Sequence, residues 1–210
     1  ALSALPLPLH AIATNWWQAI RQQPDAIRAL DTLVVNEAGD SMLTSLPRVL
    51  AGSDYIGRSL ARTPGLFASL VGSDSVLEPR SNGHIETQCT ALRGHAADSQ
   101  HVGTTLRVWR RAELVRIGWR DLAGWAKLEE VVETLSTVAD QAVSVALACA
   151  HYQVAHRHGE PIGSISGKPV RLVVLALGKL GGSKTSAAKK RSSRLNGLKG
   201  GWHKRKKGKH

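Results

Sequence analysis

Acidic residues are missing from the last part of this sequence, and their absence divides the chain. All 16 Asp and Glu lie between Asp25 and Glu160, whereas residues 183–210 contain eleven Lys or Arg and no acid. Residues 1–182 carry 17 basic side chains against those 16 acids, so the formal net charge of +12 comes almost entirely from the tail. A prediction of nucleic-acid binding from charge therefore applies only to the tail.

Cysteine is also scarce, with only Cys89 and Cys149 in 210 residues, which excludes a disulfide scaffold. Cys149 falls within an apolar helical pattern and is predicted to be a small buried side chain. No run of about 18 apolar residues occurs, so the sequence predicts no membrane span. The apolar start lacks the basic residues of a signal peptide, which favours a reduced, cytoplasmic protein.

The amino-terminal part, residues 1–105, is expected to be a helical region with loops. The globular proportions of 42% hydrophobic and 21% charged residues argue against global disorder. Residues 10–35 read as helical with a break at Gln23-Pro24, and Ser53 or Asp54 is a candidate N-cap for a later helix. The glycine-rich stretch 72–104 is predicted to be partly loop.

Two long helices are predicted next, as an antiparallel pair over residues 106–160. The first, residues 106–125, has two apolar stripes and is therefore expected to be wedged between neighbours. Its stripes are Val108, Val115, Trp119 and Leu122, and Leu106, Trp109 and Ile117. The second, about residues 127–156, has one sustained stripe formed by Val131, Leu135, Val138, Ala142, Val145, Cys149 and Tyr152.

Residues 161–182 begin with a turn and continue into an apolar run, 170–178, that predicts a buried strand. The strand leads into the glycine-rich turn Gly178–Gly182, a common way to present backbone N–H groups to a phosphate. A P-loop is disfavoured, because Ser183 stands where its second obligatory glycine belongs and no acid follows to help hold Mg²⁺.

Three blocks in order carry a resemblance: RVWRRAELVRIGWRDLAG at 107–124, LEEVVETLSTVADQAV at 128–143 and LVVLALGKLGG at 172–182. Together they resemble the amino-terminal, deadenylylating half of the bifunctional glutamine-synthetase adenylyltransferase/adenylyl-removing enzymes. The resemblance covers roughly residues 50–182.

The resemblance implies a nucleotidyltransferase that adds AMP to a tyrosine of glutamine synthetase and removes it by phosphorolysis. It implies a mainly α-helical chain followed by the first strand of a truncated α+β, polymerase-β-like nucleotidyltransferase domain. Gly178, Lys179, Gly181 and Gly182 match the start of the family's nucleotide-binding turn. Glutamine synthetase and a PII-type signalling protein are the implied partners, and Mg²⁺ is the implied cofactor.

The chain departs from the family pattern directly after Gly182. The family continues into metal-binding aspartates, whereas residues 183–210 form a basic tail, expected to be disordered, without any carboxylate. We therefore expect no Mg²⁺ binding and no catalysis by this chain. The abrupt change favours a frameshift, a rearrangement or a foreign carboxy-terminal extension.

Alternative functions follow from other residues. The chain could be a catalytically inactive helical docking module, or its tail could bind nucleic acid non-specifically. The histidines His151, His156 and His158 are interpreted as helix-end residues rather than metal ligands. Five arginines between 107 and 120 could face an acidic partner or a nucleotide, but local ion pairing is the favoured interpretation. They are Arg107, Arg110, Arg111, Arg116 and Arg120.

Overall fold

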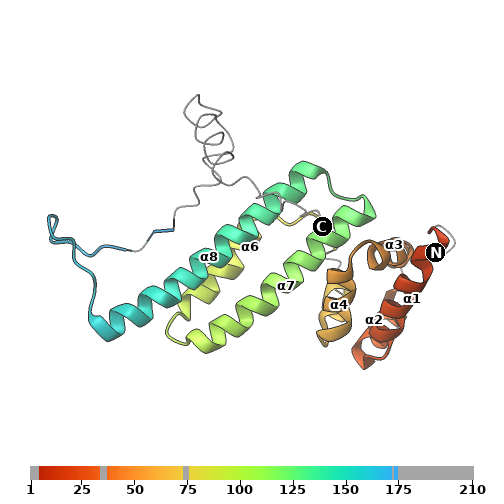
Figure 1. Cartoon of the computed structure of the whole chain (residues 1–210), viewed down its shortest axis with the longest axis horizontal. Coiled ribbons are helices and arrows are strands. Elements are labelled where there is room, and N and C mark those ends of the chain that lie inside the picture. The colour runs from red at the N-terminus through yellow and green to blue at the C-terminus, as the bar shows by residue number, and fades with distance from the viewer. Residues whose placement is uncertain (1–4, 34–36, 73–75, 172, 175–210) are drawn as a thin grey trace, which may run out of the picture. The chain divides into compact units, whose positions relative to one another are not determined.

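The computed structural model describes residues 5–33, 37–72, 76–171 and 173–174. These residues form eight α-helices (Figure 1). Their bounds are α1 Leu7–Arg21, α2 Pro24–Leu33, α3 Glu37–Gly52, α4 Asp54–Arg62, α5 Leu66–Gly72, α6 Asn82–Gly94, α7 Ser99–Ala123 and α8 Leu128–His158. The prediction of a mainly helical chain is therefore confirmed.

The amino-terminal helices α1 to α5 share one hydrophobic core, into which the carboxy-terminal half of α7 inserts Val115 and Trp119. Trp119 is fully buried, and its indole N–H donates to Ser45 Oγ of α3 at 2.9 Å. The predicted break at Gln23-Pro24 is confirmed. There, the Gln23 amide donates to the carbonyl oxygens of Leu60 and Ala61, which ties the break to the end of α4.

Side chains and glycines set the helix ends where local sequence predicts them. Ser53 caps α4 by accepting a hydrogen bond from the backbone N–H of Ile56 at 3.3 Å, which confirms one of the two candidate caps. Gly124 ends α7 with φ +79°, a left-handed conformation that favours glycine. The short connection after Gly124 turns the chain back into α8.

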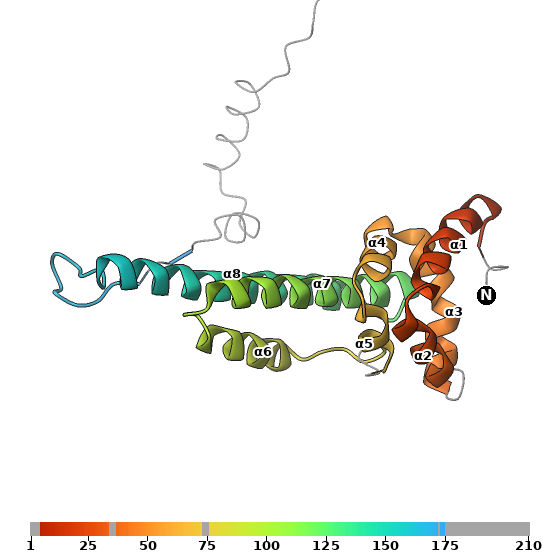
Figure 2. The ribbon, with the colours of Figure 1, turned by 90° about the horizontal axis from the view of Figure 1, so that it is seen from below.

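Helices α6, α7 and α8 pack together around a second core. Figure 2 shows α6 running beneath the long pair. Cys89, Val102, Val145 and Cys149 form one buried cluster between them, which confirms the predicted burial of Cys149. The antiparallel pairing of the two long helices is also confirmed. The chain turns back after α7, and α8 then packs against α7 in the opposite direction (Figure 1).

Two sequence predictions need correction here, and a third is confirmed in part. The stretch 72–104, predicted to be partly loop, is irregular at 76–81 and 95–98 but also contains α6, which buries Ile85 and Cys89. The first long helix begins at Ser99 rather than 106, with Asp98 as its N-cap. Val108 is 50% exposed, so it does not belong to a buried stripe.

The predicted strand is not confirmed by the residues that the structure describes. Val170, Arg171, Val173 and Val174 adopt no strand conformation and are exposed rather than buried. The Val170 backbone N–H donates to the Pro161 carbonyl oxygen at 2.8 Å, beside an isolated bridge between Ile162 and Pro169. This local contact does not extend into the paired backbone that a strand requires among the described residues. The remainder of the run, residues 175–178, lies outside the described residues.

Helix α8 is long and apolar enough to cross a membrane, by length and composition alone. Length and composition alone are weak evidence for a membrane span, because the core helix of a soluble protein passes the same test. One side of α8 is buried against α6 and α7, through Thr134, Val138, Val145 and Cys149. Leu135 and Tyr152, predicted to belong to this buried stripe, are exposed.

Candidate functional site: buried ion pairs along α7

Charged side chains line one face of α7 in the interior of the protein. Glu113, Arg116 and Arg120 are spaced three and four residues apart, which places them on the same helix face. Their side chains are only 1%, 2% and 3% exposed. Buried charges are costly unless they are paired and hydrogen-bonded, so each must have partners.

Glu113 is the centre of the first group of ion pairs. Its carboxylate accepts hydrogen bonds from Arg80 and from Arg116, whose Nε lies 3.1 Å from Oε2. Burial lowers the pKa of the Arg116 guanidinium, and the adjacent Glu113 carboxylate opposes that shift. The carboxylate therefore holds two guanidinium groups, one of them almost completely removed from water.

Arg120 forms the second group and connects three parts of the chain. Its guanidinium binds both carboxylate oxygens of Glu130 in α8, at 2.8 and 3.2 Å. It also donates to the backbone oxygens of Val76, at 3.1 Å, and Leu77. Arg120 thus ties the connection before α6 and the first turn of α8 to the end of α7.

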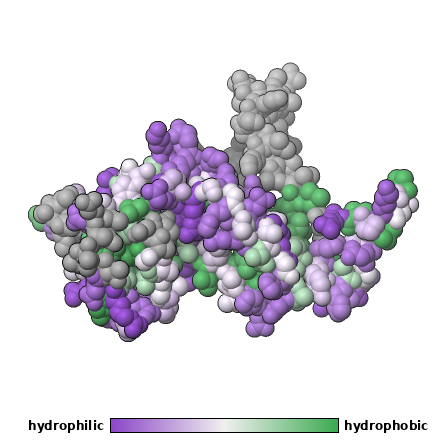
Figure 3. Space-filling model, turned by 180° about the vertical axis from the view of Figure 1, so that it is seen from behind, coloured by the Kyte–Doolittle hydropathy of each residue, from purple (hydrophilic) through white to green (hydrophobic). Residues whose placement is uncertain are grey.

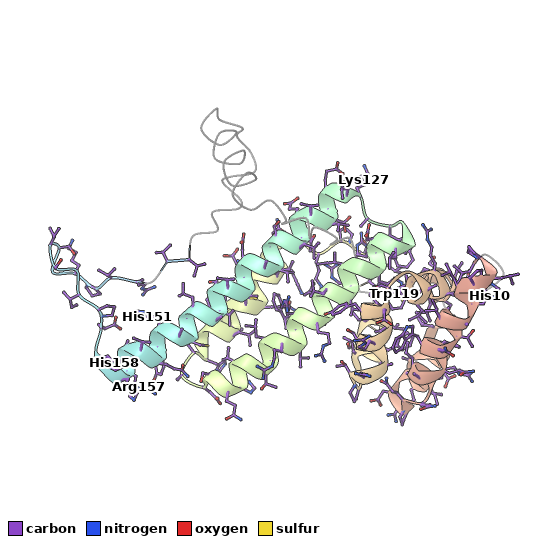
Figure 4. All side chains as sticks on the ribbon, viewed as in Figure 1. His10, Trp119, Lys127, His151, Arg157 and His158 are labelled. Carbon is purple, nitrogen blue, oxygen red and sulfur yellow. The ribbon has the colours of Figure 1, made fainter. Side chains whose placement is uncertain are left out.

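A cavity of about 460 Å³ lies beside these ion pairs, next to the first turns of α6 and α8. Arg80, Lys127, Glu129, Glu130 and Glu133 are among its lining residues. Figure 4 shows Lys127 at the start of α8, at the opposite end of that helix from His151, Arg157 and His158. The positive end of α8 is matched by Glu129 and Glu130 in its first turn.

The arrangement is suited to holding helices together. Glu113 and Glu130 are engaged by arginines and are not free to bind a metal ion. Within the described part of the chain, no three His, Cys, Asp or Glu side chains are grouped so that they could hold a metal. The Mg²⁺ implied by the sequence resemblance therefore has no fitting ligand set among these residues.

The five arginines of this helix divide into two kinds. Arg116 and Arg120 are buried and structural, as the local-pairing interpretation predicts. Arg107, Arg110 and Arg111 are exposed; Arg111 donates to Thr63 Oγ1 at 2.9 Å and Arg107 to Thr104 Oγ1 at 3.2 Å. The ion-pairing interpretation therefore holds for only part of the set.

The other predicted site residues fall into two groups. Gly178, Lys179, Gly181 and Gly182 lie outside the described residues, so their proposed nucleotide contact stays a prediction. His151, His156 and His158 lie on the last turns of α8. His151 approaches Glu160 at 3.4 Å, and the His156 ring stacks on Tyr152.

The spacing of three predicts that Glu113 can pair with an arginine of its own helix, as it does with Arg116, but sequence reasoning missed the burial of Glu113 and its pairing with Arg80. The spacing of Glu113, Arg116 and Arg120 between two apolar stripes was the available signal, because such a position on a wedged helix has little access to water. Arg80 carried no such signal, since it lies in an irregular connection far away in the sequence.

These observations define a helical domain organised around buried ion pairs. Comparison with known proteins identifies its family. The glutamate-ammonia ligase adenylyltransferase profile matches residues 43–187, from within α3 to beyond α8. The chain belongs to this family. No solved structure matches it significantly.

Individual relatives agree with that assignment. They include bifunctional glutamine synthetase adenylyltransferase/adenylyl-removing enzymes from Nitrosococcus oceani, 39% identical over 66% of this chain, and Thioalkalivibrio sulfidiphilus, 37% identical over 76%. The enzyme from Pseudomonas aeruginosa is 32% identical over 86% of the chain. The matched parts span only 14%, 17% and 18% of these three relatives, so the chain corresponds to a small part of each.

Proposed function

We propose that this chain is a helical part of an enzyme that transfers AMP to, and removes it from, a tyrosine of glutamine synthetase. The observation that carries the proposal is the family match over residues 43–187. The relatives are named for both activities, which act on glutamine synthetase. The three sequence blocks that resemble this family all lie within the matched range.

By itself, we propose, the chain does not catalyse this reaction. Transfer of a nucleotidyl group builds negative charge that bound Mg²⁺ neutralises, and carboxylates are needed to hold the metal. The sequence has no Asp or Glu after Glu160, and the described residues offer no metal-binding group. The described helices then serve as a support for catalytic parts, and Gly178 to Gly182 as a remnant of the nucleotide-binding turn.

A deadenylylation assay tests this proposal. The purified chain is mixed with AMP-modified glutamine synthetase, Mg²⁺ and phosphate, and released ADP is followed. The full-length Nitrosococcus oceani relative serves as the positive control for substrate and conditions. We expect the chain to give no ADP above a no-protein blank, and release above that blank would refute the proposed inactivity.

We also propose that the helices dock on glutamine synthetase. The main alternative is that the basic tail binds nucleic acid. Surface plasmon resonance with immobilised glutamine synthetase compares the full chain with a variant truncated after Gly182. We expect binding to glutamine synthetase by the helices to survive this truncation. Non-specific binding to nucleic acid requires the tail and weakens steeply as salt is raised. Loss of glutamine synthetase binding on truncation would therefore overturn docking by the helices.

A further inference from the structure

A second apolar stripe runs along α8, on a side that the rest of the described chain leaves uncovered. It contains eight residues at successive spacings of four, three, four, four, three, four and four. They are Leu128, Val132, Leu135, Ala139, Val143, Ala146, Ala150 and Val154. All eight are exposed, Leu128 by 71% and Val132 by 54%. At about 100° per residue, the spacing keeps the stripe on one side over about 39 Å of helix.

This stripe is distinct from the side of α8 that packs on α6 and α7. The buried residues Thr134, Val138, Val145 and Cys149 lie about 120° away around the helix. A surface helix normally carries a single apolar stripe, and an extended exposed one marks a contact surface. The two stripes together explain why α8 is apolar enough to resemble a membrane span.

The composition of the stripe limits what can cover it. Its eight members are all aliphatic and include no charged or polar side chain, so it is unsuited to a nucleotide or a nucleic acid. Its three alanines, Ala139, Ala146 and Ala150, allow close approach of another backbone or helix. A closely packed polypeptide surface fits such a stripe.

Exposed apolar side chains continue beyond the end of α8. Ile162, Ile165 and Val170 are all exposed in the segment that follows. On the face seen from behind, apolar and polar residues alternate in small patches (Figure 3). Other exposed large apolar side chains, such as Leu7 and Ile27, are scattered among α1 to α7, whereas those on α8 and directly after it form a longer series along the chain.

We propose that the α8 stripe packs against the polypeptide that the relatives carry outside the matched region. The family match includes all of α8, so the relatives contain this helix. More than four fifths of each of the three relatives lies outside the match and is available to cover it. In the longer proteins, α8 is then an interior helix between two packed bodies, with α6 and α7 on one side.

Thiol accessibility in two intact proteins tests the proposal. Val143→Cys is made in this chain, and the aligned substitution is made in the full-length Nitrosococcus oceani relative. The rate of alkylation is measured in each, with the parent proteins giving the background from native cysteines such as the buried Cys89 and Cys149. We expect alkylation to be about tenfold or more slower in the relative, because a covered site reacts only after local opening.

Glu133→Cys is the matched control, since Glu133 is exposed on α8 but lies outside the stripe. It is expected to react at similar rates in both proteins. Alkylation in urea gives the intrinsic reactivity of each thiol. Equal rates for Val143→Cys in the two folded proteins, or equal protection of Glu133→Cys, would overturn the proposal.

Two other occupants give different outcomes. If the thiol of Val143→Cys in this chain becomes more protected as the protein concentration rises, the stripe is covered by a second copy of the chain. Protection by phosphatidylglycerol vesicles assigns it to a lipid surface. Either result overturns the proposal, and no step of the experiment depends on catalysis.

Discussion

Removing the carboxylate of Glu113 is the sharpest test of the buried ion pairs. Glu113 is 1% exposed and accepts hydrogen bonds from Arg80 and Arg116. In the variant Glu113→Leu, Arg80 can turn towards solvent, because its side chain is 22% exposed. Arg116, at 2% exposure, cannot reach water and is left as a buried, uncompensated charge.

The expected loss of stability follows from that difference. Breaking a buried pair by removing one partner costs about 3–5 kcal/mol. The exposed pair Asp54–Arg58 is the matched control, and Asp54→Ala is expected to cost at most about 1 kcal/mol. Total stabilities of domains are about 5–15 kcal/mol, so Glu113→Leu removes a large share.

Urea unfolding followed by tryptophan fluorescence measures these changes, with Trp119 as a buried reporter. The double variant Glu113→Leu/Arg116→Met removes both charges and is expected to recover most of the loss, because no unpaired buried charge remains. If Glu113→Leu alone does not fold, recovery of folding in the double variant still tests the argument. A cost for Glu113→Leu no larger than for the exposed control would refute it.

Further predictions concern packing, capping and pH. Gly57→Ala places a methyl group 2.5 Å from the ring of Trp16 and should lower the free energy of unfolding in urea by about 1–3 kcal/mol. The control Gly94→Ala, with open space around the added methyl group, should cause no loss of stability. Ser53→Ala removes the cap of α4 and should cost about 1 kcal/mol, whereas Ser53→Asp should retain most of the stability. Burial raises the pKa of the Cys89 thiol above its value in the unfolded chain. The contribution of this thiol to the free energy of unfolding is therefore fully present below the unfolded pKa and is lost as the pH rises through the folded pKa. Cys89→Ala should reduce this pH-dependent loss of stability, measured by urea unfolding at several pH values.

Local signals were sufficient for much of the helical architecture. The break at Gln23-Pro24 and the cap at Ser53 depend on residues within one turn of the helix ends, so the sequence predicts them directly. The pairing of α7 and α8 followed from two long apolar patterns joined by a short turn. By contrast, α6 was missed because its polar sequence gives little periodicity.

The apolar run after residue 170 shows a different limit. Periodicity alone predicted a buried strand, yet the described residues of the run are exposed and without strand structure. Strand formation and burial both require neighbouring segments, and no pattern within nine residues specifies those neighbours. The candidate nucleotide-binding turn rests on the sequence resemblance alone.

The sequence by itself determined the family, the helical class and the separation of a nearly neutral body from a basic tail, because motifs, periodicity and charge are properties of the linear chain. Tertiary structure alone decided the role of each charged or apolar side chain. Arg116 and Arg110 look alike in the sequence, but only Arg116 is buried against Glu113. On α8, Val138 is buried while Val143 is exposed. Burial depends on what packs nearby in space, and residues distant in the sequence supply those contacts.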